Sequence, residues 1–244
     1  MEFLQHYNNS IIDRCVQRYQ QLLLTLGSCD LCHQQPVTIP LLCHHCVNDL
    51  PLFNYTLSGT DLLNWPAIDR LFPKRDFDQL VCVAPYVFPF NQWLPQLKFH
   101  NRFELSKLLA KLLITTNNIC QIVSQETTLL VVPSHIKKWQ QRGYNQSHLI
   151  ARQFAKHIGC QYLPHALCRV EQQKSQVGYS GKERRRLMAQ DFMLNEEISL
   201  PKHIVLFDDV VTTGSTVNTI SQLLKQHGVQ SITVLAISLS LPKH

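Results

Sequence analysis

The sequence predicts an α/β protein with a doubly wound, mostly parallel sheet, preceded by a small metal-binding module. Three observations support this prediction. Short β-branched apolar runs alternate with amphipathic stretches through residues 80–244, as they do in parallel sheets with helices on both faces. One such run leads directly into two aspartates and a loop of small residues. Near the N-terminus, two Cys-x-x-Cys pairs are separated by ten residues.

The composition indicates a folded protein with an anionic partner. Apolar residues make up 45% of the 244 residues, which excludes general disorder. Lysine and arginine total 23 against 17 acidic residues, a net charge of +6 that suits an anion. No apolar run approaches the ~20 residues of a membrane span. The first residues lack the pattern of a signal peptide, so we expect a cytoplasmic protein.

The chain divides into three predicted parts. Residues 1–52 form an N-terminal helix and a zinc-ribbon-like module, residues 53–79 a proline-punctuated connection, and residues 80–244 the α/β domain. Within the first part, residues 10–26 have one apolar helical face. Its polar face carries few cations, so packing on the protein is favoured over lying on a membrane surface.

The two cysteine pairs predict a structural zinc site. Tetrahedral Zn²⁺ takes four thiolates, and each tight Cys-x-x-Cys turn supplies two. The predicted ligands are Cys29, Cys32, Cys43 and Cys46. His44 and His45 lie inside the second pair and would point away from the metal if both of its cysteines bind. A redox dithiol is the alternative, but such sites usually use a single pair.

The apolar run Ile204–Phe207 predicts a strand buried on both faces, followed by a phosphate-binding loop. A helix is expected next, ending near Gly228. A helix that begins in a loop of small residues offers backbone N–H groups to an anion, whereas carboxylates accept hydrogen bonds from sugar hydroxyls. A phosphorylated sugar satisfies both. We expect the carboxylates at a solvent-open strand end, and the predicted binding residues are Asp208, Asp209, Thr212, Thr213, Gly214, Ser215 and Thr216.

A second strand is predicted at Thr128–Val132, followed by a helix that Asn145 caps and Gly159 ends. The last strand begins at Ile232. Ligands of parallel sheets lie beyond the carboxyl ends of the strands. The loops after Val132 and after Phe207 should therefore face one crevice.

The interval from Thr127 to Val170 contains no acidic residue. Its cations and aromatic rings suit single-stranded nucleic acid, since cations bind the backbone and rings stack on bases. The predicted contacts are Lys137, Lys138, Trp139 and Arg142. Alternatively, some of these cations face a pyrophosphate in the crevice. A second basic cluster at 174–186 is either a charged, solvated helix face or part of the ligand site.

The stretch from Asp208 to Thr216 resembles the phosphoribosyl-pyrophosphate loop of type I phosphoribosyltransferases. Two further segments narrow the resemblance to the ComF family: Val132–Gln146, which contains Arg-Gly-Tyr-Asn-Gln, and Leu97-Lys-Phe-His100. The cysteine pairs match that family's zinc module. One departure is visible, because Glu183-Arg184 is followed by Arg185, Arg186 and Leu187 where the family often has Glu-Arg-x-x-Asn.

This resemblance implies a cytoplasmic competence protein that acts on single-stranded DNA during natural transformation, in some cases with a helicase-like partner. It also implies that the acidic pair holds ribose hydroxyls and that the loop cradles the 5′-phosphate. Two alternatives stay open. One is an active phosphoribosyltransferase or phosphoribosyl hydrolase of unknown acceptor, with Mg²⁺ on the pyrophosphate. The other is a phosphoribosyl-pyrophosphate sensor that neither binds DNA nor turns its ligand over.

Overall fold

The computed structural model describes residues 27–34, 36–56, 59–116, 119–135, 140–170 and 191–242. The chain divides into two compact units, Met1–Leu50 and Pro51–His244. Three predicted features lie outside the described residues: the amphipathic helix over 10–26, the basic cluster at 174–186, and the side chains of Lys137, Lys138 and Trp139. No helix among the described residues has the length and apolar character needed to cross a membrane.

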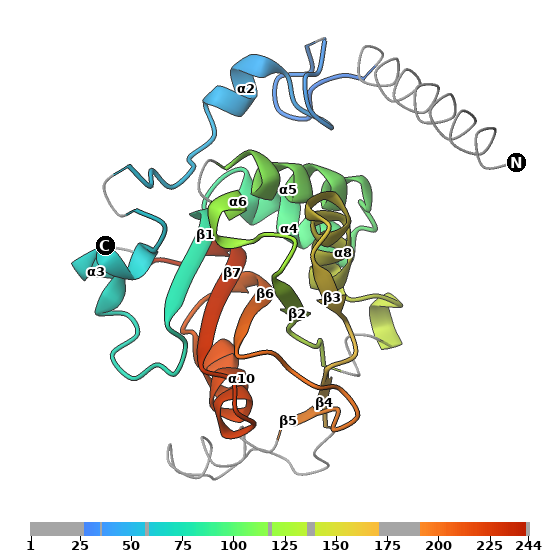
Figure 1. Ribbon diagram of the computed structural model, residues 1–244. Coiled ribbons are helices and arrows are strands. Elements are labelled where there is room, and N and C mark those ends of the chain that lie inside the picture. Colours follow the sequence, from blue (N-terminus) through green and yellow to red (C-terminus); the bar gives the residue numbers. More distant parts are fainter. Residues whose placement is uncertain are drawn as a thin grey trace, which may run out of the picture. The chain divides into compact units, whose positions relative to one another are not determined.

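The second unit contains the predicted parallel sheet, which the structure confirms (Figure 1). Its five strands run in the order β1-β7-β6-β2-β3, and every neighbouring pair is parallel. Their bounds are β1 Gln79–Pro85, β2 Thr128–Val131, β3 Gln161–Leu163, β6 His203–Val211 and β7 Ser231–Leu239. A separate antiparallel pair consists of β4 (Leu167–Arg169) and β5 (Phe192–Leu194). In the sequence, the second basic cluster falls within the segment that connects β4 to β5.

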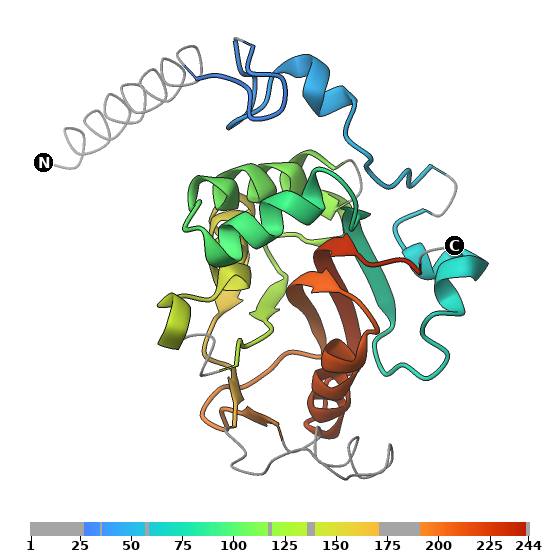
Figure 2. The ribbon, with the colours of Figure 1, turned by 180° about the vertical axis from the view of Figure 1, so that it is seen from behind.

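Helices form two groups around this sheet. Figures 1 and 2 show α4 (Phe90–Phe99), α5 (Glu104–Thr115) and α8 (Gln146–Ile158) together, with α10 (Ser215–Gln226) apart from them. The remaining described helices are short: α2 His44–Asn48, η1 Leu62–Asn64, α3 Pro66–Asp69 and α6 Ile119–Ile122. The predicted limits of α8 are confirmed, since the Asn145 side chain accepts a hydrogen bond from the Ser147 N–H and Gly159 has a left-handed φ of 80°.

Helix α4 had no counterpart in the sequence prediction. Its buried residues Phe90, Trp93, Leu94 and Leu97 recur at helical spacing, but Pro95 lies among them. Proline normally interrupts a helix, so it hides this periodicity from a pattern-based analysis. The helix brings the Leu97-Lys-Phe-His segment against the sheet.

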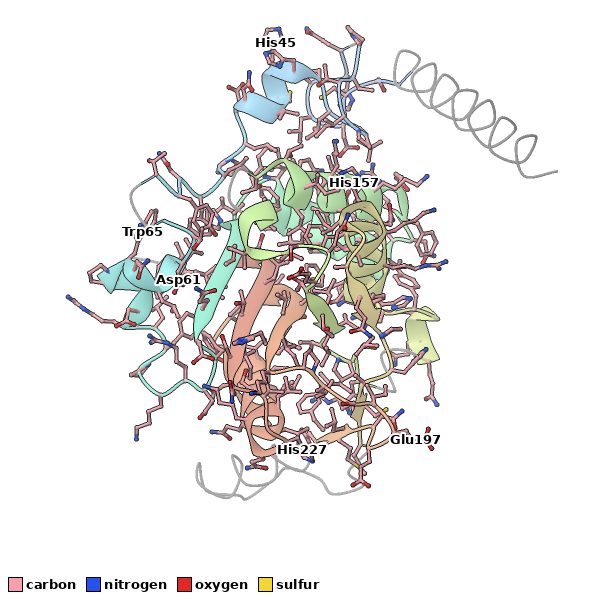
Figure 3. All side chains as sticks on the ribbon, in the orientation of Figure 1. His45, Asp61, Trp65, His157, Glu197 and His227 are labelled. Atoms are coloured by element: carbon pink, nitrogen blue, oxygen red, sulfur yellow. The ribbon has the colours of Figure 1, made fainter. Side chains whose placement is uncertain are left out.

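Phe53, Tyr55 and Asp61 form hydrogen bonds along the open edge of β1. The N–H of Phe53 donates to the Val83 carbonyl at 3.0 Å, and the Tyr55 hydroxyl both donates to and accepts from the Cys82 backbone. Asp61, labelled in Figure 3, accepts from the Leu80 N–H at 3.0 Å. Unpaired strand edges favour association with other chains, and these contacts protect the edge.

The chain order places a topological switch point between β2 and β6. The crossover from β2 through α8 leads to β3 on one side, whereas the crossover from β6 through α10 leads to β7 on the other. Parallel sheets bind ligands in the crevice beside such a point, where the two helix N-termini converge. The predicted meeting of the loops after Val132 and Phe207 follows from this topology.

Residues 71–77 pack against the start of α10. The Asp76 N–H donates to Asn218 Oδ1 at 2.6 Å, and Gln222 Nε2 donates to Asp76 Oδ2 at 2.8 Å. The buried Phe72 ring lies so close to Gly214 that a Cβ added there would come within 2.7 Å of it. Gly214 also has a left-handed φ of 71°. The glycine of the loop is therefore required by its backbone and by its packing.

We predict that Gly214→Ala destabilises the protein before any effect on a ligand is considered. The left-handed backbone costs a non-glycine residue about 1–2 kcal/mol, and contact with Phe72 adds to this. The steric part of this destabilisation is measured by thermal unfolding of three variants: Gly214→Ala, Phe72→Leu and the double variant. Gly214→Ala should cost less in the Phe72→Leu background, and purely additive effects would contradict the packing argument.

Candidate functional site

The acidic pair lies inside β6, so the prediction of a solvent-open strand end is wrong for Asp209. This residue is only 4% exposed, and Asp208 is partly buried. β6 continues past the pair with β7 along one side, which pairs Asp208 with Ala236 and Val211 with Leu239, and side chains of α4 and α8 cover Asp209. On the other side, β2 ends opposite Phe207. The carboxylates therefore face the switch point from within the sheet.

Three side chains from other elements satisfy this buried pair. Lys98 of α4 forms an ion pair with Asp209 Oδ2. Gln146 Nε2 donates to Asp209 Oδ1 at 3.2 Å, and the Ser147 hydroxyl lies 3.3 Å from the same oxygen and 3.4 Å from Asp208 Oδ1. A buried charge is tolerated only when it is paired and hydrogen-bonded, so these contacts make the arrangement stable.

The two carboxylates differ in their electrostatics. Burial raises the pKa of Asp208 well above its usual value, and the negative charge of Asp209 raises it further. The Asp209 N–H, which donates to Asp208 Oδ1 at 2.9 Å, and the Lys98 ammonium act in the opposite direction and lower this pKa. The pair thus retains a proton at a pH where an exposed aspartate has lost its own.

The predicted phosphate loop lies at the N-terminus of α10. Thr212, Thr213 and Ser215 are exposed, and the Thr213 hydroxyl donates to Ser215 Oγ at 3.1 Å. A small hollow of about 30 Å³ lies between Asp208 and residues 210–217. The first N–H groups of a helix lack partners within it, so this turn can accept an anion beside the carboxylates.

Two sequence motifs meet at the acidic pair. Leu97–His100 supplies Lys98, and the Arg-Gly-Tyr-Asn-Gln segment supplies Gln146. The Tyr144 hydroxyl donates to the Leu97 carbonyl and so joins the two segments. Sequence analysis singled out both motifs through the family resemblance but assigned no role to Lys98, Gln146 or Ser147.

Among the predicted nucleic-acid residues, the structure describes Arg142. Its Nη1 donates to Gln146 Oε1 at 3.3 Å, and its guanidinium lies 4.4 Å from the centre of the Phe99 ring. Arg142 is therefore connected to Asp209 through the side chain of Gln146. One cation of the acid-free stretch, Arg142, thus lies near the acidic pair.

A larger cavity of about 520 Å³ opens at the ends of β2 and β3. Its polar lining includes Ser134, His148, His165 and Arg169. His148 Nδ1 lies 2.8 Å from the Tyr162 hydroxyl. Burial lowers the pKa of His148, and the charges of Arg152 and His165 lower it further, so His148 stays neutral near pH 7. The cavity adjoins the N-terminus of α8.

In the N-terminal unit, the four predicted cysteines come together. The sulfur atoms of Cys29, Cys32, Cys43 and Cys46 all lie within 4.8 Å of one another. Neither His44 nor His45 belongs to this group, and His44 Nε2 instead lies 3.1 Å from Asn48 Nδ2. Burial raises the pKa of Cys29, but hydrogen bonds from the backbone of Cys32, Cys43 and Leu31 outweigh it and lower the pKa to about 6. Four clustered thiols with N–H donors suit a tetrahedral metal ion.

One family of known domains matches part of this chain, and several known proteins match most of its length. The phosphoribosyl transferase domain family matches residues 145–238. Competence protein F of Haemophilus influenzae is 30% identical over 218 residues, which cover 87% of this chain and 90% of that protein. DNA utilization protein YhgH of Escherichia coli O157:H7 is 32% identical over 222 residues, covering 88% and 91%. Competence protein ComFC of Streptococcus pneumoniae is 25% identical over 156 residues, covering 62% and 66%.

The raised pKa of Asp208 predicts that Asp208→Asn stabilises the ligand-free protein. The folded wild type holds a proton that the unfolded chain releases above about pH 4, so its free energy of unfolding falls as pH rises toward the folded pKa. Each unit of pKa elevation costs about 1.4 kcal/mol, and an amide avoids this cost. Thermal melts between pH 4 and 8 should show an advantage of the variant that grows with pH. A constant or shrinking difference would contradict the assignment.

Proposed function

Because the chain belongs to the ComF/YhgH competence protein family, we propose that it is a cytoplasmic DNA-uptake factor that binds single-stranded DNA and phosphoribosyl pyrophosphate. The observation that carries the proposal is the convergence of Asp208 and Asp209 with the N-termini of α8 and α10 at the switch point. The carboxylates would accept hydrogen bonds from ribose hydroxyls. The backbone of Thr212–Thr216 would bind the 5′-phosphate, and Mg²⁺ would accompany the pyrophosphate.

Several features support a role with DNA. Relatives that match about nine-tenths of this chain are named for competence and DNA utilization. The interval from Thr127 to Val170 carries no acidic residue, and its cation Arg142 lies beside an exposed aromatic ring. Lys137, Lys138 and Trp139 precede Arg142 in the same segment and are proposed to contact the strand with it. Natural transformation would then supply the DNA, and a helicase-like competence protein is the proposed partner.

Turnover of phosphoribosyl pyrophosphate is a second candidate function, and the cavity at the ends of β2 and β3 favours it. Its volume of about 520 Å³ leaves room for an acceptor or a leaving group beside the crevice. Arg169 would stabilise negative charge on a departing pyrophosphate, and the acidic pair would hold the ribose as its anomeric carbon becomes cationic. Release of pyrophosphate by the purified protein would distinguish this candidate from binding alone.

The four-cysteine cluster is proposed to hold a structural Zn²⁺. Four thiolates fill a tetrahedral site and leave no position for water or substrate, so the metal would stabilise the N-terminal unit without taking part in chemistry.

Asp208→Asn tests the ligand site and separates binding from folding. We expect the variant to melt at or above the wild-type temperature yet bind phosphoribosyl pyrophosphate with Mg²⁺ at least about tenfold more weakly, since the amide replaces an oxygen that can accept a hydrogen bond from a ribose hydroxyl with an NH₂ group that can only donate. Titration calorimetry measures this affinity. Glu197→Gln is the control, because Glu197 is an exposed acid outside the crevice. Wild-type affinity in Asp208→Asn would place the ligand elsewhere.

Cys32→Ser with Cys46→Ser tests the metal. Binding energies of structural zinc sites are about 10–16 kcal/mol, so the double variant should lose its zinc and leave the N-terminal unit partly unfolded. Zinc content by mass spectrometry and proteolysis within residues 27–50 give the two measurements. Cys168→Ser, which changes an exposed cysteine outside the cluster, is the control. Retention of one zinc per chain by the double variant would overturn the proposed ligand set.

A further inference from the structure

Two phenylalanines are unusually exposed where α4 ends and α5 begins. Phe99 is 62% exposed and Phe103 is 47% exposed. Aromatic side chains are normally among the most buried in a protein, and a pair left open at one turn indicates an interaction surface. Among the described residues, Phe88 is the other phenylalanine of comparable exposure, at 57%.

The surroundings of this pair are cationic and aromatic. The Arg142 guanidinium lies 4.4 Å from the centre of the Phe99 ring. The Phe103 and Tyr144 rings meet edge to face, with their centres 4.8 Å apart. The Tyr144 hydroxyl is tied to the backbone of α4 through its hydrogen bond to the Leu97 carbonyl. We call these four residues, Phe99, Phe103, Arg142 and Tyr144, the aromatic–cation surface.

Two covalent or hydrogen-bonded connections join this surface to the acidic pair. Phe99 directly follows Lys98, whose ammonium is paired with Asp209. Arg142 donates to Gln146, which in turn donates to Asp209. The surface therefore borders the proposed ligand crevice.

We propose that the aromatic–cation surface stacks on the bases of single-stranded nucleic acid. The inference rests on the proposed function and deepens it by naming where the strand is bound. Ring faces stack on any base, and a neighbouring guanidinium adds charge for the phosphates. The nearest acidic residue in sequence, Glu104, is neutralised by Arg102 at 2.8 Å. Positive charge beside open rings favours a polyanion with aromatic bases over an acidic or apolar protein surface.

Leucine substitutions distinguish stacking from general apolar contact. Phe99→Leu and Phe103→Leu keep an apolar side chain but remove the ring, and Phe99→Trp enlarges the ring. Fluorescence anisotropy with a labelled deoxythymidine oligomer should show the double leucine variant binding about five- to hundredfold more weakly than wild type, with an unchanged salt slope. Phe99→Trp should bind at least as well as wild type. Phe88→Leu, the matched control, should bind like wild type.

Arg142→Met provides the electrostatic half of the test. It should lower the affinity for the oligomer. It should also reduce the magnitude of the salt slope by roughly 0.7, the value for one phosphate contact to a single strand. Phosphoribosyl pyrophosphate binding by Phe103→Leu, measured by calorimetry, should match that of wild type, because the Phe103 ring packs on Tyr144 and not on the acidic pair.

The outcomes separate this inference from the function on which it rests. Wild-type protein that binds the oligomer while the double leucine variant binds it equally well would overturn the aromatic–cation surface and leave the proposed function standing. Wild-type protein that binds no oligomer in low salt would overturn both. Equal loss of affinity in Phe88→Leu would also overturn the assignment, because exposed rings would then act without regard to position.

Discussion

The ion pair between Lys98 and Asp209 organises the second unit. Asp209 is buried in a strand that continues through the middle of the sheet, where an unpaired carboxylate would be too costly to keep. Lys98 reaches it from α4, and Gln146 with Ser147 reaches it from the first turn of α8. One buried charge thus fixes the positions of two helices relative to β6.

The same interaction explains why the site lies between β2 and β6. β2 stops opposite Phe207, so the side of β6 that faces it loses its neighbouring strand just before the acidic pair. The β7 side stays paired to Val211 and keeps the backbone of the pair rigid. Helix α8 fills the start of the vacant side, and α10 begins from the end of β6. A preorganised binding site requires a fixed backbone, which pairing with β7 provides, and space for a ligand, which the end of β2 leaves.

Sequence patterns predicted those features that depend on local chemistry. The buried run Ile204–Phe207, the Asn145 cap and the clustered cysteines each follow from residue type and spacing. Features set by distant partners were not predictable. The burial of Asp209 depends on Lys98 and Gln146 from two distant helices, and the contact between Gly214 and Phe72 joins segments more than a hundred residues apart in the chain. Helix α4 was missed because Pro95 masks its periodicity.

Lys98 and Phe99 are neighbours at the end of α4, and each borders the proposed site of a different ligand: phosphoribosyl pyrophosphate for Lys98 and nucleic acid for Phe99. If phosphoribosyl pyrophosphate drew Lys98 from Asp209 toward its own phosphates, the end of α4 and the ring of Phe99 would move with it. Arg142 would respond through Gln146, which shares Asp209 as its partner. If phosphoribosyl pyrophosphate changed the affinity for a nucleic-acid strand by some factor, the strand would change the affinity for phosphoribosyl pyrophosphate by the same factor. If both proposed ligands bind, the shared carboxylate of Asp209 would couple their sites without any overlap of the two ligands.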